Sequence, residues 1–429
     1  MKEEKMTILI KHAQVFYQDK FTKLDLYIDE HQHLNLANKI DVDADEVINA
    51  RGLHVFPGLI DVHTHLREPG FEYKETIKTG TMAAAKGGYT TIFCMPNLKP
   101  VTDSVETYDA LLALIQQESL IHVQPYVAIT KGEKGEELVD IKTLSQKTRF
   151  FSDDGKGVQD DEMMRRAMKL AHDHNAMIVS HCEDESLLIK GGAVNQGNLE
   201  AKYDQIGISS ASEYQQIARD LKLAKATGCQ YHVCHVSTKE GVELIRQAKK
   251  AGVKVSCEVT PHHLLLCEDD VTSDDGMFKM NPPLRTKDDQ DALLAGLQDR
   301  TIDMIVTDHA PHSRAEKAKG LKDSLFGVIG LDFAFSLLYK RLVLTKKVKL
   351  IDLLHWMSTS PAQVFDIQGG SLEQNELANL VIFDLNEKGK ITDDNILSKA
   401  QNTPFMNNDI QAINKMTIID GKIVYRKGL

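Results

Sequence analysis

The sequence lacks long hydrophobic runs. No apolar stretch approaches the roughly 18 to 20 residues that a helix needs to span a bilayer. The segment from Met1 to Lys11 is charged before it is apolar, unlike a secretory signal. We therefore expect a cytoplasmic protein that makes no membrane contact.

The sequence also lacks paired cysteines. Its six cysteines contain no Cys-x-x-Cys motif, and most lie within apolar, strand-like runs. A disulfide framework or a thiolate metal site would show closer pairing. We expect buried free thiols in a reducing compartment at Cys94, Cys182, Cys229, Cys234, Cys257 and Cys267.

A basic surface is missing as well. The net charge is -11 at pH 7, and no cluster of lysine and arginine is interleaved with aromatic residues. Nucleic-acid binding proteins usually carry such a cluster. The charge pattern therefore argues against a nucleic-acid partner and favours chemistry on a small molecule.

What the chain does contain is a regular alternation of short apolar runs and longer helical segments between about residues 59 and 310. The composition, with 42% hydrophobic and 26% charged residues, suits one large globular domain with a smaller satellite. The helical segments include residues 74–86, 161–174, 213–227 and 239–251, and three of these are followed by glycine, a normal helix stop. This alternation is typical of βα units around a parallel sheet.

Eight candidate strands are present, which predicts an α/β fold of the TIM-like (β/α)8 barrel type. They span residues 59–65, 90–95, 123–129, 149–152, 177–181, 231–235, 254–258 and 304–308. The flanks differ, because residues 7–16, 24–28, 46–48, 380–383 and 416–425 are β-type. We expect a small β-sheet domain from residues 1–56 and 365–429, beside a barrel at 57–364.

Histidine and aspartate residues follow several of these strands. His63 and His65 end the first strand two residues apart, so both side chains point to one face and can share a metal. His181, His235 and Asp308 end three other strands, and the carboxyl ends of barrel strands surround one mouth. Four imidazoles and a carboxylate form a ligand set typical of zinc.

Two adjacent carboxylates follow the fourth strand. Two cations held close together need a bridging anion, and we choose Asp154 for this role. Asp153 is the candidate for a purely structural role in the Asp-Asp-Gly turn. We expect Asp61 to orient a ligand histidine through its second ring nitrogen, and we do not predict that His262, His263 or His309 bind metal.

These residues lie within longer motifs. The segment GLIDVHTHLREPG at 58–70 resembles the first signature of the dihydroorotase family, part of the amidohydrolase superfamily. CMPN at 94–97, NPPLR at 281–285, TDHAPH at 307–312 and FGVIG at 326–330 follow in family order. The resemblance covers nearly the whole chain and points to the stand-alone bacterial class, which uses aspartate as the bridge. Departures occur in the C-terminal tail, at residues 378–381 and 405–408.

The resemblance implies a role for each matching residue. Two Zn²⁺ ions per subunit are expected, one held by His63, His65 and Asp308 and the other by His181 and His235, with Asp154 as the bridge. The substrate's free carboxylate is expected at Arg67, Asn97 and His312, and guanidinium is well suited to carboxylate. The full set of expected substrate contacts is His65, Arg67, Asn97, Asn281, His312, Phe326 and Gly327.

The family activity is the reversible cyclisation of N-carbamoyl-L-aspartate to L-dihydroorotate in de novo pyrimidine (UMP) biosynthesis (EC 3.5.2.3). A metal-bridging hydroxide would attack the ring amide, and Asp308 would be the catalytic proton shuttle. The resemblance further implies a homodimer and allows association with aspartate transcarbamoylase.

Two other interpretations remain. The chain could be another cyclic amidase, such as a hydantoinase or allantoinase, although those relatives typically carry lysine where Asp154 lies and do not need Arg67 and Asn97. It could also be an inactive homologue that acts as a scaffold. Every expected ligand is present, which argues against that last class.

Overall fold

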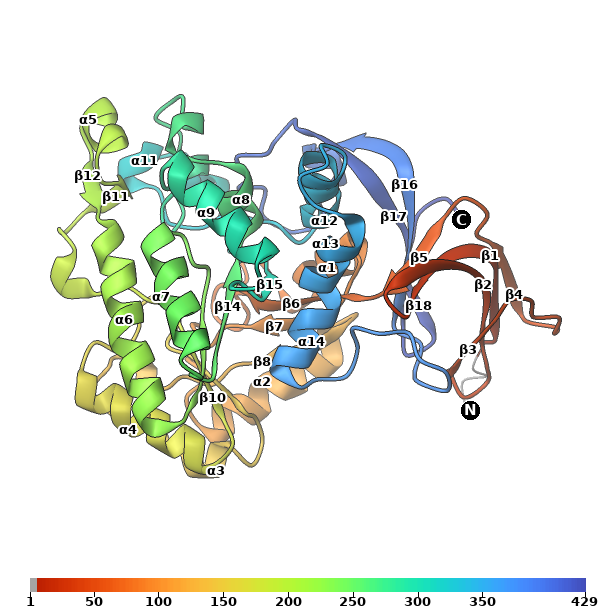
Figure 1. Cartoon of the computed structure of the whole chain (residues 1–429), viewed down its shortest axis with the longest axis horizontal. Coiled ribbons are helices and arrows are strands. Elements are labelled where there is room, and N and C mark those ends of the chain that lie inside the picture. Colours follow the sequence, from red (N-terminus) through yellow and green to blue (C-terminus); the bar gives the residue numbers. More distant parts are fainter. Residues whose placement is uncertain (1–5) are drawn as a thin grey trace.

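The computed structural model describes residues 6–429 and contains two groups of strands (Figure 1). One group is parallel and is accompanied by helices, and the other is a mainly antiparallel sheet to its side. The predicted small domain begins at residue 1, and residues 1–5 of it lie outside the described residues. None of the helices in residues 6–429 has the length and apolar character to cross a membrane.

The parallel strands form a three-stranded sheet and a five-stranded sheet. The first contains β6 (Leu59–Thr64), β7 (Tyr89–Cys94) and β8 (His122–Pro125). The second contains β9 (Phe150–Phe151), β10 (Met177–Ser180), β13 (Gln230–Val233), β14 (Val255–Val259) and β15 (Met304–Ile305). Isolated parallel bridges connect the two sheets on both sides, Val127 with Phe151 and Thr64 with His309.

Most of the parallel strands end earlier than the sequence patterns predict, although β14 ends one residue later, at Val259. β15 stops at Ile305 rather than at Asp308, and β13 stops at Val233 rather than at His235. His235 has a φ of 27° and Asp308 a φ of 46°, so neither backbone is extended. His235 and Asp308 therefore lie just beyond the strands, on the turns that leave them.

The main helices are α1 (Ile77–Gly87), α2 (Val105–Glu118), α4 (Asp161–Asp173), α6 (Ser210–Thr227), α7 (Lys239–Lys250) and α9 (Lys287–Gln298). α1 begins three residues after the predicted start because Thr76 caps it, its side chain accepting from Thr79 N. α6 begins three residues early for the same reason, with Ser209 as its cap.

Shorter elements connect these units. They are α3 (Ile141–Leu144), α5 (Asn198–Tyr203), α8 (Pro261–Leu265), α10 (Arg314–Lys317), α11 (Gly320–Asp323), α12 (Ala334–Leu338), α13 (Leu350–Leu354) and α14 (Ser360–Phe365). A two-stranded sheet, β11 (Gly192–Asn195) with β12 (Ile206–Ile208), was not predicted. These strands are only three or four residues long, too short for a clear alternation.

The second group of strands joins both flanks of the chain in one sheet of order β18-β17-β16-β5-β1-β2-β3, with β4 paired to β1. Its strands are β1 (Ile8–Tyr17), β2 (Lys20–Ile28), β3 (Leu34–Ala37), β4 (Glu46–Asn49), β5 (His54–Pro57), β16 (Leu380–Lys390), β17 (Asp409–Ile419) and β18 (Lys422–Arg426). β5 pairs antiparallel with β16, which connects the N-terminal strands to the C-terminal ones.

The β structure predicted at residues 416–425 is confirmed, but it is not continuous. Residues 416–425 form parts of two strands, because Asp420 and Gly421 have φ values of 47° and 73° and turn the chain between β17 and β18. A two-residue turn with positive φ at both positions matches the twist of a hairpin.

A buried cluster lies between the parallel strands. Ile60, Phe93, Phe150, Val179 and Val306 belong to it and come from five different βα units. Phe365 at the end of α14 packs into the same cluster. All six cysteines are free and buried, as predicted.

Candidate metal centre

Five of the predicted ligands come together around Asp154. His63 Nε2 lies 3.3 Å from Asp154 Oδ1, and His65 Nε2 lies 3.5 Å from Asp154 Oδ2. Asp308 Oδ1 is 3.6 Å from His63 Nε2 and 3.2 Å from His65 Nε2. These four side chains are almost fully buried, so their polar ligand atoms face one another with little water around them.

The remaining two histidines approach Asp154 from another direction. His181 Nδ1 and His235 Nε2 are 3.0 Å apart, and His235 Nε2 lies 4.0 Å from Asp154 Oδ1. The ligand atoms of Asp154, His181 and His235 are within 4.8 Å of one another, and so are those of His63, His65 and Asp154. Asp154 is thus common to two groups, which is the position of a bridge.

The ligand atoms of these histidines and aspartates suit metal cations. His63 Nε2 and Asp154 Oδ1 are buried and have no hydrogen-bond partner, and burying polar atoms unpaired is costly. Burial together with the neighbouring imidazoles of His181 and His63 lowers the pKa of His235 well below its usual value. A neutral imidazole keeps the lone pair that a metal needs. The site therefore fits a pair of divalent cations.

Asp154 is also charged in this setting. Burial opposes its ionisation, but His63 and His65 nearby lower its pKa well below the usual range. Asp153 is occupied elsewhere, because Oδ1 accepts from the backbone N–H groups of Ile129 and Thr130 and Oδ2 accepts from the Thr130 hydroxyl. Asp153 thus has a structural role, but it bonds to residues 129–130 rather than within its own turn, and the bridging role of Asp154 stays a prediction.

The residue that orients His63 differs from the prediction. Asp61 accepts from the backbone N–H groups of His63 and Thr307, not from an imidazole. His63 Nδ1 instead donates to Glu258 Oε1 at 2.6 Å, and Glu258 Oε2 lies 3.0 Å from His232 Nε2. Sequence analysis missed Glu258, although a carboxylate inside a buried strand run is an unusual feature that signals a partner.

Asn97 orients His65 as Glu258 orients His63. Its Oδ1 accepts from His65 Nδ1 at 3.0 Å, and its Nδ2 donates to Asp154 Oδ2 at 3.3 Å. An oriented second nitrogen fixes the tautomer and the direction of a ligand imidazole. Asn97 therefore orders the candidate ligands, in addition to the substrate contact expected from the sequence.

Arg67 and His312 lie together at one side of the metal ligands. Arg67 has a φ of 62°, its Nε donates to Pro311 O at 3.3 Å, and its terminal nitrogen lies 3.4 Å from His312 Nε2. His312 Nε2 donates to Phe326 O at 2.7 Å. The structure thus joins three of the residues expected at the substrate.

Gly327 lies beside His312, and Asn281 lies beside His181. A Cβ atom on Gly327 would lie 2.7 Å from the Ala310 Cβ, and the φ of 134° favours glycine. Asn281 Nδ2 is 3.5 Å from His181 Nε2 and donates to Glu183 Oε1 at 3.2 Å. Glu183 is a further carboxylate beside the ligands that the sequence did not indicate.

Of the three histidines that the sequence analysis set aside as ligands, His263 and His309 have other partners. His263 contacts Thr260 Oγ1 and Pro282 O, and His309 lies 3.3 Å from Glu75 Oε2. His262 is buried beside His263. None of the three belongs to either group around Asp154.

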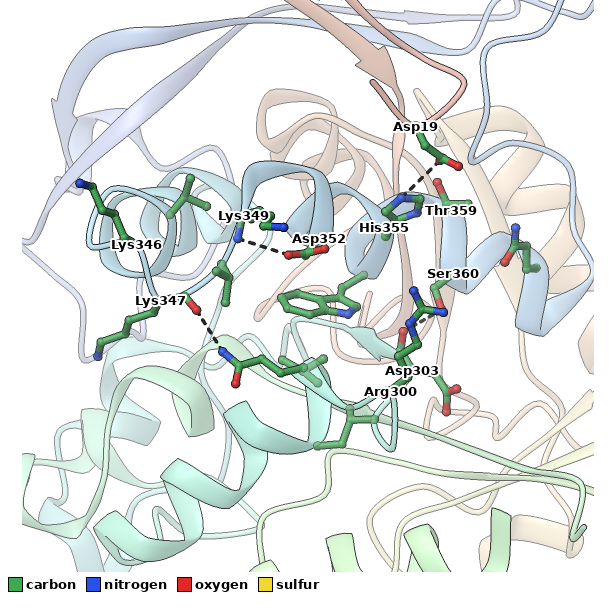
Figure 2. Close-up of a pocket in the computed structure, with 17 residues that line it drawn as sticks. Asp19, Arg300, Asp303, Lys346, Lys347, Lys349, Asp352, His355, Thr359 and Ser360 are labelled. Atoms are coloured by element: carbon green, nitrogen blue, oxygen red, sulfur yellow. Dashed lines mark hydrogen bonds and ion pairs between the residues drawn. The ribbon is translucent and has the colours of Figure 1, made fainter. Parts of the chain in front are cut away.

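A separate cavity lies away from the candidate metal ligands. It measures about 940 Å³ and is lined by residues that include Asp303, which directly precedes β15, and Ser360 at the start of α14. Figure 2 shows Lys346 and Lys347 at its edge, extending away from Ser360. It contains no predicted site residue, and it is at the amino end of β15, whereas the candidate ligands follow the carboxyl ends of the strands.

Comparison with known proteins identifies the family. Residues 52–241 match the family model described as dihydro-orotase-like. The chain is 46% identical over 418 residues to a dihydroorotase of Fusobacterium nucleatum subsp. nucleatum, covering 97% of this chain and 98% of that relative. It is 47% identical over 424 residues to a dihydroorotase of Bacillus cytotoxicus, covering 98% of this chain and 99% of that relative.

Solved structures agree in fold. An L-hydantoinase (dihydropyrimidinase) from Arthrobacter aurescens has a TM-score of 0.89 at 25% identity, covering 99% of this chain and 97% of its own. A D-hydantoinase (dihydropyrimidinase) from Thermus sp. has a TM-score of 0.87 at 24% identity, covering 98% and 96%. Because the nearly full-length sequence matches are to dihydroorotases, the chain belongs to the dihydroorotase family.

Proposed function

We propose that this chain is a metal-dependent dihydroorotase, which interconverts N-carbamoyl-L-aspartate and L-dihydroorotate in pyrimidine biosynthesis. The observation that carries the proposal is the grouping of four histidines and Asp308 around Asp154 in a chain 47% identical to a dihydroorotase over nearly its whole length. The substrate is a small molecule.

The proposed architecture is a closed (β/α)8 barrel at residues 57–364 beside a small β domain from residues 1–56 and 365–429. Eight parallel strands, the bridges that connect their two sheets on both sides, and one shared interior cluster support it. In such a barrel, side chains that follow different strands meet at one mouth.

We assign two Zn²⁺ ions to the site. His63, His65 and Asp308 would hold one, His181 and His235 the other, and Asp154 both. When bound, the cations would supply Lewis acidity toward the ring carbonyl and lower the pKa of a water between them. Imidazole and carboxylate ligands suit zinc, and the two unpartnered atoms in the site support a cation there.

In ring opening, water adds to the carbonyl carbon, the carbon–nitrogen bond breaks, and the nitrogen gains a proton. Asp308 accepts the proton from the attacking water and delivers it to the departing nitrogen. Its pKa supports the first step: burial opposes ionisation, but His65 and His63 lower the pKa, so the carboxylate is free to accept.

Substrate binding is assigned to the residues beside Asp308. Arg67, Asn97 and His312 would bind the free carboxylate, because a guanidinium, an amide and an imidazole all offer N–H donors. Asn281 and the backbone at Phe326 and Gly327 would contact the ring, with His65 facing the reacting amide. The neighbouring positions of Arg67, His312 and Phe326 support this division.

A homodimer, association with aspartate transcarbamoylase and a cytoplasmic location remain predictions from the family resemblance and the sequence. Size-exclusion chromatography with and without the transcarbamoylase measures the first two. Elution as a monomer in both conditions would contradict the homodimer and the association with the transcarbamoylase.

The function is tested by assaying the purified protein with dihydroorotate before and after chelation, with metal content measured on the same sample. We expect turnover that chelation abolishes and Zn²⁺ restores, at about two ions per chain. Hydantoin and allantoin assayed in parallel separate this activity from that of other cyclic amidases. Faster turnover of hydantoin than of dihydroorotate would reject the proposal.

A further inference from the structure

Lys74 contacts one ring nitrogen of His312, Nδ1, whereas Arg67 and Phe326 lie at the other, Nε2. Its Nζ is 3.2 Å from His312 Nδ1. Both side chains are buried, with 8% of Lys74 and 5% of His312 exposed. A buried ammonium needs a partner, and this one is placed against the imidazole that the proposed function assigns to the substrate carboxylate.

The two ring nitrogens of His312 have opposite partners. Phe326 O can only accept, so the Nε2 at 2.7 Å from it carries a proton. The Lys74 ammonium can only donate and lies 3.2 Å from Nδ1, whereas the Glu316 Oε2 at 3.6 Å is too far for a hydrogen bond, so Nδ1 is the acceptor. Both contacts therefore select one neutral tautomer, protonated at Nε2. The Arg67 terminal nitrogen and a protonated Nε2 are both donors, so their 3.4 Å contact is not a hydrogen bond.

Lys74 is itself held in place. Glu316 Oε1 lies 3.2 Å from its Nζ and accepts from the Tyr73 hydroxyl at 2.9 Å. The Phe71 and Tyr73 rings lie 5.5 Å and 5.6 Å from the same ammonium, within cation–π distance. Three groups besides His312 therefore fix the ammonium, which cannot move away from His312 without losing contacts to them.

We propose that Lys74 is a positioning residue for substrate binding, which holds His312 in the Nε2-protonated neutral form so that the Nε2–H, which donates to Phe326 O without substrate, turns or is shared to donate to the free carboxylate of dihydroorotate when it binds. The inference rests on the proposed function, since that function supplies the carboxylate. The other neutral tautomer would present a lone pair to an anion, which is repulsive. Lys74 thus acts through His312 and does not touch the substrate.

A different role for Lys74 is structural, as the ion-pair partner of Glu316. The two roles predict different results in a double-mutant cycle with His312. If Lys74 acts through His312, its replacement has no effect once the imidazole is gone. If Lys74 stabilises the local fold, its replacement costs the same in both backgrounds.

The kinetic experiment compares K74M and K74R in the wild-type background and K74M in the H312A background. We expect K74M to raise KM about tenfold with kcat within about twofold, as for the loss of one hydrogen bond to a charged partner. K74R keeps a donor and should recover most of the affinity. K74M/H312A should match H312A. The control is K78M, the same exchange at an exposed lysine four residues along.

The tautomer is read directly, without activity, from two-bond ¹H–¹⁵N spectra of histidine-labelled protein, in which the His312 signals are those missing from H312A. We expect a protonated Nε2 and an unprotonated Nδ1 in wild type, and loss of this pattern in K74M. A protonated Nδ1 in wild type, or additive effects in the cycle, would overturn the role of Lys74 even if dihydroorotate is turned over. Absence of turnover with the expected spectrum would instead reject the proposed function.

Discussion

His63 Nδ1 and Glu258 Oε1 lie 2.6 Å apart although 195 residues separate them in the chain. Burial alone would raise the pKa of Glu258, but His63 and His232 lower it to about 2, so the carboxylate is ionised. A charged acceptor at Nδ1 leaves Nε2 of the same ring free and makes it more basic toward a metal.

Glu258→Gln should therefore weaken metal binding. We expect affinity for Zn²⁺ to fall about tenfold or more, the usual effect of losing a partner behind a ligand histidine. Competition with a fluorescent chelator measures it. Glu243→Gln, at an exposed position on α7, is the control. Unchanged affinity in Glu258→Gln would mean that this contact does not tune His63.

Asp154→Asn and Asp153→Asn should separate the two adjacent carboxylates. The first should lose the second cation, because the bridging charge is gone. The second should keep the metals but lower stability by about 1–3 kcal/mol, because three buried donors lose their charged acceptor. Metal analysis and urea unfolding of the same preparations provide both readouts. The reverse pattern would exchange the two roles.

Asp308→Asn should stop turnover while metal is retained. The amide keeps the shape of the side chain but cannot accept a proton, so kcat should fall at least about a hundredfold. Metal content determined beside kcat separates loss of the shuttle from loss of the site. A variant with kcat near that of wild type would show that another group moves the proton.

Arg67→Lys should weaken substrate capture more than it slows the reaction. The guanidinium is planar and offers several donors, which one ammonium cannot replace, so KM should rise about tenfold. Initial rates over a range of dihydroorotate concentrations give both constants. Arg165→Lys, exposed on α4, is the matched control. A fall in kcat at constant KM would contradict a binding role.

Acid should weaken the contacts that hold Lys74. Burial opposes the ionisation of Glu316, but the backbone N–H of Ser313 and the Lys74 ammonium lower its pKa to about 2. The folded pKa is below the ordinary value of 4.5, so this stabilisation is complete above about pH 5.5 and is lost as pH falls from about 4.5 toward 2.

The matching measurement is the unfolding free energy of wild type and Glu316→Gln across pH. Because solvent screens a partly exposed pair, we expect a difference of about 1 kcal/mol at neutral pH that shrinks below pH 4.5. A difference that grows on acidification would have the wrong sign.

Much of the candidate site was predictable from sequence. His63, His65, His181 and His235 each end a short apolar run, and a run of this kind indicates a strand without knowledge of its neighbours. The same rule failed for strand ends, because positive φ at His235 and Asp308 depends on the turns that follow. It did indicate β structure at residues 416–425, but not that the Asp420-Gly421 turn divides this stretch into two strands.

The sequence by itself determined which chemical groups follow which strands, because alternation, turn residues and motifs are local properties of the chain. Only the tertiary structure decided what each of those groups bonds to. His63 bonds to Glu258, Asp153 accepts from the backbone of Ile129, and His312 accepts from Lys74. Such pairs join distant segments, and their contacts depend on distances of a few tenths of an ångström that no local pattern encodes.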